Sequence, residues 1–326
     1  MKLPRRKFFH LAAGAAALPA MSRIAWAQAY PARPVRVIVP FAPAGSTDIL
    51  ARLIGQWLSE RLGQSFIIEN RPGASTMIGT EAVVHSPADG YTLIVFGTAS
   101  AINATLYENK IRYDFLRDIA PVAGILRVPN VVAVHPSLPV RTIPELIAYA
   151  KANPGRINVE SPGAGTSSHL AGELFKVMTG VNMVHVAYRG DGPAMTDLIG
   201  GQVQVGFATM TASIGHIRAD RLRALAVTTA ARSQALPDIP TVSDFIPGYE
   251  ASSWFGIAAP KDTPAAIVDH LNRETNTGLA DPNIMGRLAD MGGMMLAGSA
   301  ADFGKLIADE TAKWAKVNKV AGIKPQ

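Results

Sequence analysis

Short apolar runs alternate with stretches of helical periodicity along the first hundred residues. The run VRVIVPF, Val35 to Phe41, is β-branched and predicts a buried strand. The stretch that follows it, PAGSTDILARLIGQWLSERLG, carries apolar residues at helical spacing and predicts a helix. A strand at 66–68, a helix ending at His85 and a strand at 92–96 continue the alternation. This βαβαβ order favours the α/β class and a parallel sheet.

The alternation restarts after residue 130 and predicts a second α/β unit. Strands are expected at 131–134, 157–159, 184–188, 203–207 and 222–227, and helices at 142–152, 167–178, 193–199 and 214–219. A strand at 254–259 and helices at 264–278, 283–290 and 299–319 close the chain. Two such units leave a cleft between them. In α/β sheets, ligands bind beyond the carboxyl ends of the strands.

The first 27 residues predict an export signal. A basic front, MKLPRRK, precedes the short apolar stretch LAAGAAAL, and the small-x-small cleavage site AWA stands just before Gln28. The apolar stretch is too short to span a bilayer. Arg5-Arg6 followed by KFF resembles a twin-arginine signal, which exports folded proteins. The alternative is an ordinary secretory signal that carries two arginines.

Composition and charge exclude several classes of protein. With 48% hydrophobic and 17% charged residues, the 326-residue chain is globular. The signal holds five basic residues and no acidic ones, so its removal lowers the net charge from +6 to +1. A nucleic-acid partner therefore loses its main support. The chain has no cysteine, which excludes disulfides, thiolate metal sites, a cysteine nucleophile and a lipoprotein anchor. No later apolar run is long enough to span a membrane, so we expect a soluble mature protein.

The loops that follow the predicted strands share one composition, rich in Gly, Ala, Pro, Ser and Thr. They are 43–48, 71–76, 97–103, 162–168, 189–192 and 208–212. Helices start directly behind them, and the free N–H groups and positive dipole at a helix N-terminus bind anions without a lysine. Two helix starts that face each other across a cleft could hold two carboxylates. The plainer interpretation is that Ser46 or Thr47, and Thr166 or Ser167, only cap their helices.

Enzymatic interpretations of the same residues find less support. GAGTSSH is not a P-loop, and no G-x-S-x-G elbow occurs. Ser168 and His169 are adjacent, so on a helix their side chains diverge. His169 and Glu173 supply only two potential metal ligands, and H-E-x-x-H is absent. An exported serine hydrolase that uses Ser168 or Ser100 with a histidine remains the alternative function.

Two charged residues of these loops have more than one interpretation. Asp48 lies in the first turn of a predicted helix, where the dipole favours a carboxylate. It could also order the loop or meet a cationic group of a ligand. Arg189 is the candidate cation on the rim of the cleft, or else a solvated arginine at a turn.

A series of stretches in fixed order resembles the substrate-binding proteins of tripartite tricarboxylate transporters, also called the Bug family. They include PVRVIVPFAPAGSTDILAR, ENRPGAS, GAGTSSHLAGELF, VAYRGDGPAMTDLIGGQVQVGF and LPDIPTVSDFIPGYEASSWFGIAAP, and the resemblance runs from Val35 to the C-terminus. It implies a periplasmic, non-enzymatic binding protein with a two-domain periplasmic-binding-protein fold of type II-like architecture. The two α/β domains would hold a small carboxylate in the interdomain cleft, with no cofactor and no metal.

The resemblance also implies a ligand cradle and a set of partners. The cradle maps onto Phe41, Pro43, Ala44, Gly45, Ser46, Thr47, Asp48, Thr98, Ala99, Ser100, Gly163, Ala164, Gly165, Thr166, His169, Tyr188, Arg189, Ala208 and Thr209. The partners would be the permease subunits of such a transporter or a sensor kinase, with no nucleic acid, and the protein would be a monomer. Because the chain crosses early and returns late, we expect domain 1 to comprise 28–128 and 253–326 and domain 2 to comprise 129–252. Hinges are expected at Arg127–Asn130 and Glu250–Trp254.

Two departures from the family pattern bear on the ligand. The usual Gly-Gly of the first loop is Ala44-Gly45 here, which keeps the N–H donor but disfavours a positive φ at position 44. The acidic or amide residue that many members carry after the strand ending at Phe207 is replaced by Ala208, Thr209 and Met210. Met210 in the pocket would favour apolar bulk. The distal end of the ligand would then belong to a longer aliphatic or an aromatic acid.

Overall fold

The computed structural model describes residues 30–320. The predicted signal, residues 1–27, and its cleavage site before Gln28 lie outside the described residues. Within them, strands and helices alternate as the apolar pattern predicts, and the chain is of the α/β class.

The strands form one sheet with the order β2-β1-β3-β9-β4-β7-β5-β6, and β8 and β10 pair with β4 off this path. Their bounds are β1 Val35–Val39, β2 Phe66–Asn70, β3 Thr92–Gly97, β4 Ile119–Val134, β5 Asn158–Ser161, β6 Val184–Ala187, β7 Val205–Thr209, β8 Arg223–Val227, β9 Ser252–Pro260 and β10 Met294–Met295. The expected parallel pairing is found for β1 with β2 and β3, and for β5 with β6 and β7. The prediction of a parallel sheet does not hold for the whole sheet. Strand β9 runs antiparallel to β3 and β4, and β4 runs antiparallel to β7.

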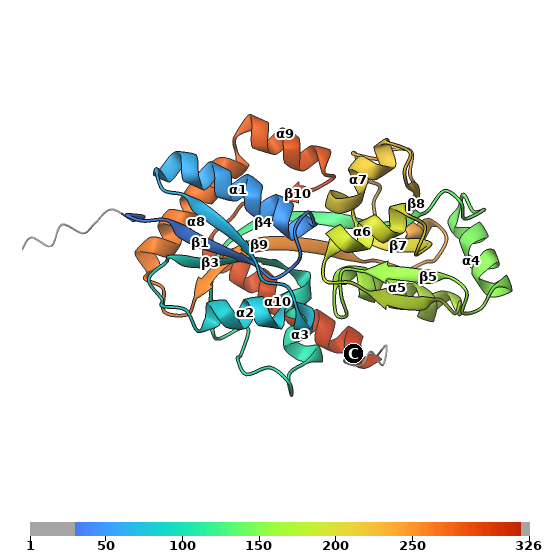
Figure 1. Cartoon of the computed structure of the whole chain (residues 1–326), viewed down its shortest axis with the longest axis horizontal. Helices are drawn as coiled ribbons and strands as arrows, with labels where there is room; N and C mark the ends of the chain where they lie inside the picture. The colour runs from blue at the N-terminus through green and yellow to red at the C-terminus, as the bar shows by residue number, and fades with distance from the viewer. Residues whose placement is uncertain (1–29, 321–326) are drawn as a thin grey trace, which may run out of the picture.

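Helices cover the sheet and divide the molecule into two parts. They are α1 Ser46–Leu62, α2 Met77–Val84, α3 Thr98–Leu106, α4 Ile143–Ala152, α5 Ser167–Thr179, α6 Asp191–Ile199, α7 Met210–Arg218, α8 Ala265–Leu279, α9 Pro282–Asp290 and α10 Ala300–Val320. We call lobe 1 the part that holds β1, β2, β3, β9 and β10 with α1, α2, α3, α8, α9 and α10. Lobe 2 holds β5 to β8 with α4 to α7 (Figure 1).

The long strands β4 and β9 connect the lobes. β4 pairs with β9 along its first part and with β7 and β8 along its last residues, so it belongs to both lobes (Figure 1). The two expected hinge segments meet here in register, with Arg127 opposite Trp254 and Pro129 opposite Ser252. The predicted domain boundaries, at 128/129 and 252/253, lie on β4 and at the start of β9, and they stay a prediction.

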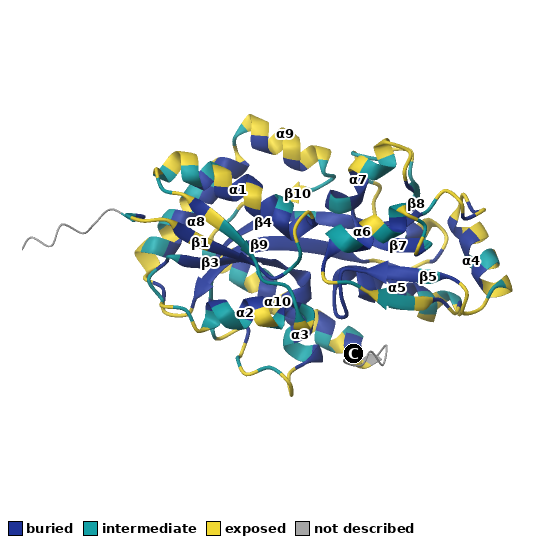
Figure 2. Ribbon diagram, viewed as in Figure 1, coloured by how far each residue is buried: buried dark blue, intermediate teal, exposed yellow. Residues whose placement is uncertain are grey.

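Each lobe has its own apolar core. In Figure 2 the buried residues follow the strands, and the exposed ones lie on the outward faces of helices such as α4 and α9. The core of lobe 1 joins β1, β3 and β9 to α1 and α8, and that of lobe 2 joins β4, β5 and β7 to α4 and α5. Phe96 packs edge-to-face on Phe115 and Trp254, with ring centroids 5.4 and 5.7 Å away. Such pairs add about 1 kcal/mol each beyond the area they bury, so the end of β3 is held firmly.

Two predicted loops are regular structure instead. Residues 98–103 form the first part of α3, and β7 passes directly into α7 at Thr209 and Met210, leaving no loop at 208–212. TASAINATL is rich in small polar residues, which is why its helical periodicity is weak. Both changes bring helix N-termini, rather than open loops, to the boundary between the lobes.

Candidate functional site

Helices α1, α3, α5, α6 and α7 all begin where the two lobes meet. Their first turns and the adjoining strand ends surround what we call the inner cavity. It is lined by Phe41, Thr47, Gly97, Thr98, Ala99, Pro162, Thr166, Ser167, Ser168, Asp191, Thr209, Ser253 and Phe255. The first N–H groups of a helix have no partner inside the helix and carry its positive dipole end. The lining therefore combines backbone donors, hydroxyl groups, two phenylalanine rings and the carboxyl group of Asp191, with no lysine or arginine.

The loop before α1 is ordered by Asp48. The Asp48 carboxylate accepts hydrogen bonds from Ala44 N–H at 3.0 Å and from Asn70 Nδ2 at 2.9 Å, and it pairs with Arg52. Burial opposes ionisation of Asp48, but these contacts outweigh it and lower its pKa. Asp48 therefore orders the loop, and it also lies in the first turn of α1, where the helix dipole favours a carboxylate. Ser46 and Thr47 do not cap α1; its N-cap is Gly45.

The expectation against a positive φ at Ala44 was wrong, since its φ is 65°. A left-handed conformation costs an L-residue about 1–2 kcal/mol. The hydrogen bond from Ala44 N–H to buried Asp48 offsets part of that cost, because it fixes the turn that the conformation makes. The loop thus keeps the shape that a Gly-Gly pair would allow.

The loop before α5, GAGT at 163–166, is shaped by its glycines and by His169. Thr166 caps α5 as expected, its Oγ1 accepting from His169 N–H at 3.2 Å. Gly165 has φ 72° and lies so close to α3 of the other lobe that a Cβ would stand 2.0 Å from Asn103 Oδ1. Only glycine fits there.

His169 is a structural residue of this loop. Its Nδ1 accepts from Gly165 N–H at 3.1 Å, and its ring stacks on that of His185 with centroids 4.0 Å apart. Burial, with smaller effects of His185 and Lys176, lowers the pKa of His169 to about 3. The imidazole is therefore neutral near pH 7.

The lobes are joined by direct hydrogen bonds across the cavity. Ser46 N–H donates to Asp191 Oδ2 at 2.9 Å, and the hydroxyls of Ser46 and Thr209 are hydrogen bonded to each other. The Ser167 and Ser253 hydroxyls lie 2.6 Å apart. The inner cavity has a volume of about 30 Å³, room for only a few water molecules. An organic acid can therefore enter only when the lobes separate.

Two carboxyl groups of lobe 2 are buried here: Asp191, which makes one of these contacts, and Glu160. Burial raises the pKa of Asp191, against the effect of hydrogen bonds from Ser46 and Thr209. Burial and the nearby Asp191 raise the pKa of Glu160 to about 8, and neither Glu160 oxygen has a hydrogen-bond partner in the described part of the chain. Sequence reasoning missed both residues. Asp191 stands inside the examined loop 189–192, but a carboxylate in a helix first turn needs no further explanation.

A wider outer pocket lies beside the inner cavity at the boundary between the lobes. The outer pocket has a volume of about 470 Å³ and shares Phe41 and Pro162 with the inner cavity. Its walls are the segments 72–76 and 162–164 and the residues Ala187, Tyr188 and Arg189. Tyr188 donates its hydroxyl to Asp197 Oδ2 at 2.7 Å, and Arg189 is exposed.

The predicted cradle residues divide between these two spaces. Phe41, Thr47, Thr98, Ala99, Thr166 and Thr209 line the inner cavity, and Phe41, Gly163, Ala164, Tyr188 and Arg189 line the outer pocket. The remaining nine line neither. Eight of them flank the cavity, namely Pro43, Ala44, Gly45, Ser46, Asp48, Ser100, Gly165 and His169, and the ninth, Ala208, belongs to the core of lobe 2. The sequence did not single out Gly97, Pro162, Ser167, Asp191, Ser253 and Phe255 as ligand residues.

Met210 does not line the inner cavity. It is fully buried among Val131, Ile214 and Val227, and Ser233 Oγ donates to its sulfur. The basis for expecting an apolar distal end of the ligand at Met210 is therefore removed. Apolar side chains line the outer pocket instead, from Pro40, Phe41, Pro72, Ile78 and Pro162.

The serines proposed as nucleophiles are not bonded to a base. Ser100 and Ser168 are buried, and within residues 30–320 their hydroxyls have no hydrogen-bond partner. Ser161 Oγ does lie 2.6 Å from His185 Nε2, but it also bonds the backbone of Gly163 and does not line the inner cavity. Residues 30–320 contain no group of three His, Asp or Glu side chains placed to hold a metal ion.

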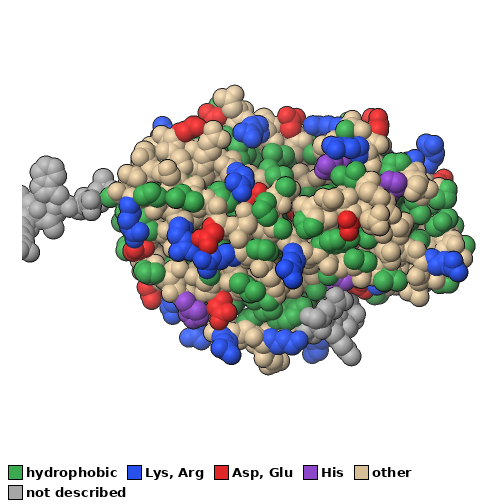
Figure 3. All heavy atoms as spheres, viewed as in Figure 1, with side chains coloured by type: hydrophobic (Ala, Val, Ile, Leu, Met, Phe, Trp, Pro, Cys, Tyr) green, Lys and Arg blue, Asp and Glu red, His purple; other side chains and the backbone are tan. Residues whose placement is uncertain are grey.

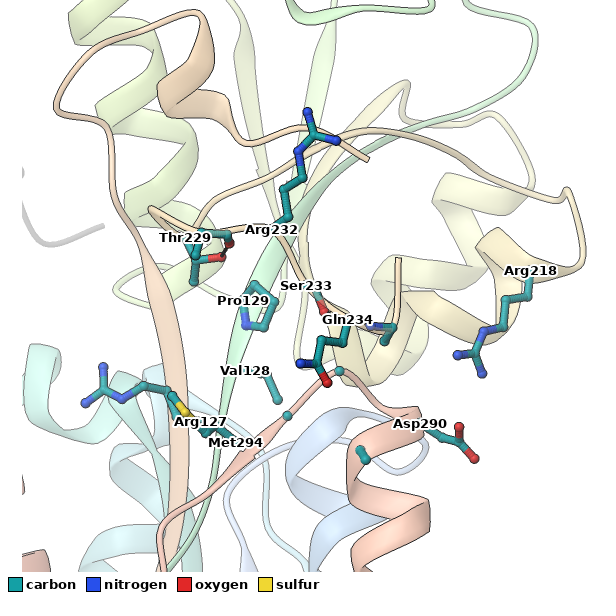
Figure 4. A pocket seen from close by; sticks show the side chains of 15 residues that line it. Arg127, Val128, Pro129, Arg218, Thr229, Arg232, Ser233, Gln234, Asp290 and Met294 are labelled. Atoms are coloured by element: carbon teal, nitrogen blue, oxygen red, sulfur yellow. Dashed lines mark hydrogen bonds between the residues drawn. The ribbon is translucent and has the colours of Figure 1, made fainter. Parts of the chain in front are cut away.

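A third cavity, the hinge cavity, has a volume of about 650 Å³ and is larger than the inner cavity and the outer pocket. It lies against β4 at Arg127, Val128 and Pro129, between the ends of α7 and α9. Figure 4 shows the side chains of Arg127 and Arg232 pointing away from its middle. Arg127 is engaged by Ser252 and Glu310. Size alone therefore does not make this cavity the ligand site, since its arginine head groups do not converge.

The face of the molecule shown in Figure 3 has no large patch of only basic or only acidic side chains. Figure 3 shows basic and acidic side chains interspersed there, with hydrophobic ones between them. Among the described residues no helix combines the length and apolarity that a membrane crossing requires.

Comparisons with known proteins agree on one family. A family model described as "Tripartite tricarboxylate transporter family receptor" matches residues 50–323. Protein BugT of Bordetella pertussis is 38% identical over 301 residues, which cover 91% of this chain and 92% of BugT. A solved structure, "R. palustris Rpa4515 with adipate", is 40% identical with a TM-score of 0.87, covering 91% of this chain and 100% of that one. MatC from Rhodopseudomonas palustris with bound malate is 29% identical with a TM-score of 0.84, covering 88% and 99%.

Proposed function

This chain belongs to the tripartite tricarboxylate transporter receptor family, the Bug-type binding proteins, and on that premise we propose that it captures a small carboxylate between its lobes. The protein acts in the periplasm after export. It hands the acid to the permease subunits of such a transporter, or reports its presence to a sensor. Two relatives of the same fold, solved with adipate and with malate, support a carboxylate as the ligand.

One observation carries the proposal: the N-terminus of α1 already holds a carboxylate. Asp191 Oδ2 accepts the Ser46 N–H across the gap between the lobes. A ligand carboxylate that enters the inner cavity would find the same kind of donor there and at the start of α5, where Thr166, Ser167 and Ser168 line the cavity. The site thus attracts a carboxylate with main-chain dipoles and hydroxyls rather than with a buried cation.

Capture requires opening and closure about β4 and β9. The proposed hinges are Arg127–Asn130 and Glu250–Trp254, between domain 1 (28–128 and 253–326) and domain 2 (129–252). A ligand stabilises the closed state only as far as it binds that state better. The contacts of Ser46 with Asp191 and Thr209, and of Ser167 with Ser253, belong to the closed arrangement.

Thermal unfolding of residues 28–326 with a panel of carboxylates tests the proposal. A ligand that binds only the folded state, at about 100 times its dissociation constant, adds about 2.7 kcal/mol to the free energy of unfolding. We expect a shift with some mono-, di- or tricarboxylates and none with the matched amides. Equal shifts with amides, or none with any acid, would contradict the proposal. Labelling by a fluorophosphonate, expected to be negative, separates it from the serine hydrolase.

A further inference from the structure

The turn between β2 and α2 has an unusual backbone. Ala74, Ser75 and Thr76 all have positive φ, at 45°, 51° and 81°. This left-handed conformation is unfavourable for an L-residue, because it brings Cβ too close to the following carbonyl oxygen. Three consecutive non-glycine residues in it persist only where the surrounding structure holds them, and such strain clusters at ligand clamps and switch regions. We call residues 74–76 the strained turn.

The side chain of Asn103, in α3, holds the strained turn. Its Nδ2 donates a hydrogen bond to Ser75 C=O, and the residue is only 2% exposed. Its Oδ1 lies against Gly165 of lobe 2, where a Cβ would stand 2.0 Å away. One buried side chain thus contacts the strained turn with its nitrogen and the other lobe with its oxygen.

The strained turn is also connected to lobe 2 through Met77, the first residue of α2. Met77 packs against an apolar cluster that contains Leu106 of α3 and Leu170 of α5. Leu170 belongs to lobe 2 and lies in the first part of the helix that follows Gly165. In the closed arrangement Gly165 lies against Asn103, and Leu170 shares the cluster with Met77. Both supports of the strained turn therefore depend on the position of lobe 2.

The strained turn differs from the other left-handed position near the inner cavity, Ala44. There a hydrogen bond to Asp48 of the same loop offsets part of the cost, whatever the position of the lobes. The hydroxyl of Thr76, by contrast, has no hydrogen-bond partner among residues 30–320. The contacts that hold the strained turn come from Asn103 and Met77, and these two residues also meet lobe 2.

We propose that the strained turn stores energy in the closed arrangement and thereby favours separation of the lobes. Asn103 and Met77 keep it left-handed while lobe 2 packs on them, and it relaxes when lobe 2 moves away. A ligand that closes the lobes must offset the stored energy, so its affinity is lower and its release is faster than with a relaxed turn. The inference rests on the proposed function, because it concerns the motion by which that function captures an acid.

Glycine substitutions in the strained turn test this, because glycine adopts positive φ without the steric cost of a Cβ. Ala74→Gly removes one exposed methyl group, and Ser75→Gly keeps the C=O that Asn103 bonds. The matched control is Asp262→Gly, since Asp262 has φ 65°, is exposed and follows the end of β9 opposite the hinge segment. In calorimetric titrations with adipate and with malate, we expect Ala74→Gly and Ser75→Gly to bind about three- to thirtyfold tighter than the wild type. Asp262→Gly should bind as the wild type does.

A second measurement follows closure without any ligand. The chain contains no cysteine, so dyes attach only to introduced cysteines. Gln56→Cys in lobe 1 and Asn182→Cys in lobe 2 are both exposed positions, and energy transfer between dyes on single molecules reports how far apart the lobes are. We expect Ser75→Gly to raise the ratio of closed to open molecules by about the same three- to thirtyfold factor, and Asp262→Gly to leave this ratio unchanged.

The outcomes separate the strained turn from the proposed function. If Ser75→Gly and Ala74→Gly match the wild type in affinity and in the ratio of closed to open molecules, the strain is equal in both arrangements and the inference is wrong, while the proposed function stands. An equal shift in Asp262→Gly would contradict the inference as well. If the wild type binds no acid at all, the proposed function falls, whereas energy transfer still tests the strained turn. A circular dichroism spectrum of each variant confirms that it is folded.

Discussion

The backbone N–H of Ser46 donates to the carboxylate of Asp191 at 2.9 Å, although the two residues are 145 positions apart in the chain. The bond places a buried carboxyl group of lobe 2 at the N-terminus of α1 in lobe 1. It therefore contributes to closure as an interlobe hydrogen bond, and in its ionised form also as a charge at the positive end of a helix dipole.

Asp191 should oppose an anionic ligand even as it joins the lobes. Asp191→Asn keeps an acceptor oxygen for Ser46 N–H but removes the charge, so we expect carboxylates to bind about three- to tenfold tighter than to the wild type. Asp191→Ala, which loses the acceptor as well, should bind more weakly than Asp191→Asn. Calorimetry on both variants measures this. Because burial raises the pKa of Asp191, the gain in Asp191→Asn should grow as pH rises. An Asn variant no tighter than the wild type would show that this charge does not act on the ligand.

Gly165 should be required for closure rather than for folding. Gly165→Ala places a Cβ where Asn103 Oδ1 of the other lobe lies, while Gly180→Ala, at a similar φ of 69°, meets nothing within 4 Å. Both changes cost about 1–2 kcal/mol for the left-handed conformation. We expect similar losses of stability in the two variants without ligand, but at least a tenfold weaker carboxylate affinity only in Gly165→Ala. Denaturant unfolding and calorimetry measure the two quantities. Equal affinities would mean that the lobes close around the extra methyl group.

Glu160 should make the protein less stable as pH rises. Its pKa is raised to about 8 in the folded protein, above the usual value near 4.3 of an exposed glutamate. The folded state then binds more protons than the unfolded state between these values. Glu160 therefore adds stability that is complete below about pH 4.3 and is lost as pH rises toward 8. We expect Glu160→Gln to flatten the fall in midpoint temperature between pH 5 and pH 8. An unchanged pH profile would place the Glu160 titration outside this window.

Most helices and strands could be predicted from the local pattern of apolar residues. The apolar periodicity of α1 and α5 located both helices to within a few residues, and Thr166 was recognised as a cap. The sheet was harder, because strand direction depends on where the chain returns. β4 was expected only at 131–134, since Pro121, Gly124 and Pro129 interrupt the strand pattern of a segment that pairs with β9 along its length.

The sequence located the segments of the site that follow a strand, but it did not single out every lining residue within them, such as Ser167 and Asp191. Thr47, Thr98 and Thr166 stand in segments that follow strands, which the strand-end rule selects, and the family resemblance places them in the cradle. Ser253 reaches the inner cavity at the beginning of β9, a place that the strand-end rule does not examine. The conformation of Ala44 depends on a hydrogen bond to Asp48, which residue preferences alone do not contain.

The absence of lysine and arginine from the lining of the inner cavity has a consequence for how such a protein can evolve. A hydrogen bond donated by the main chain survives almost any substitution of its own residue, proline excepted. Mutations at Thr47, Ala99 or Ser168 would therefore reshape the space around a bound acid without deleting the donors that anchor it. A protein of this fold can therefore come to bind a different acid through substitutions of the side chains that line the cavity. The main-chain donors that hold the carboxylate stay unchanged.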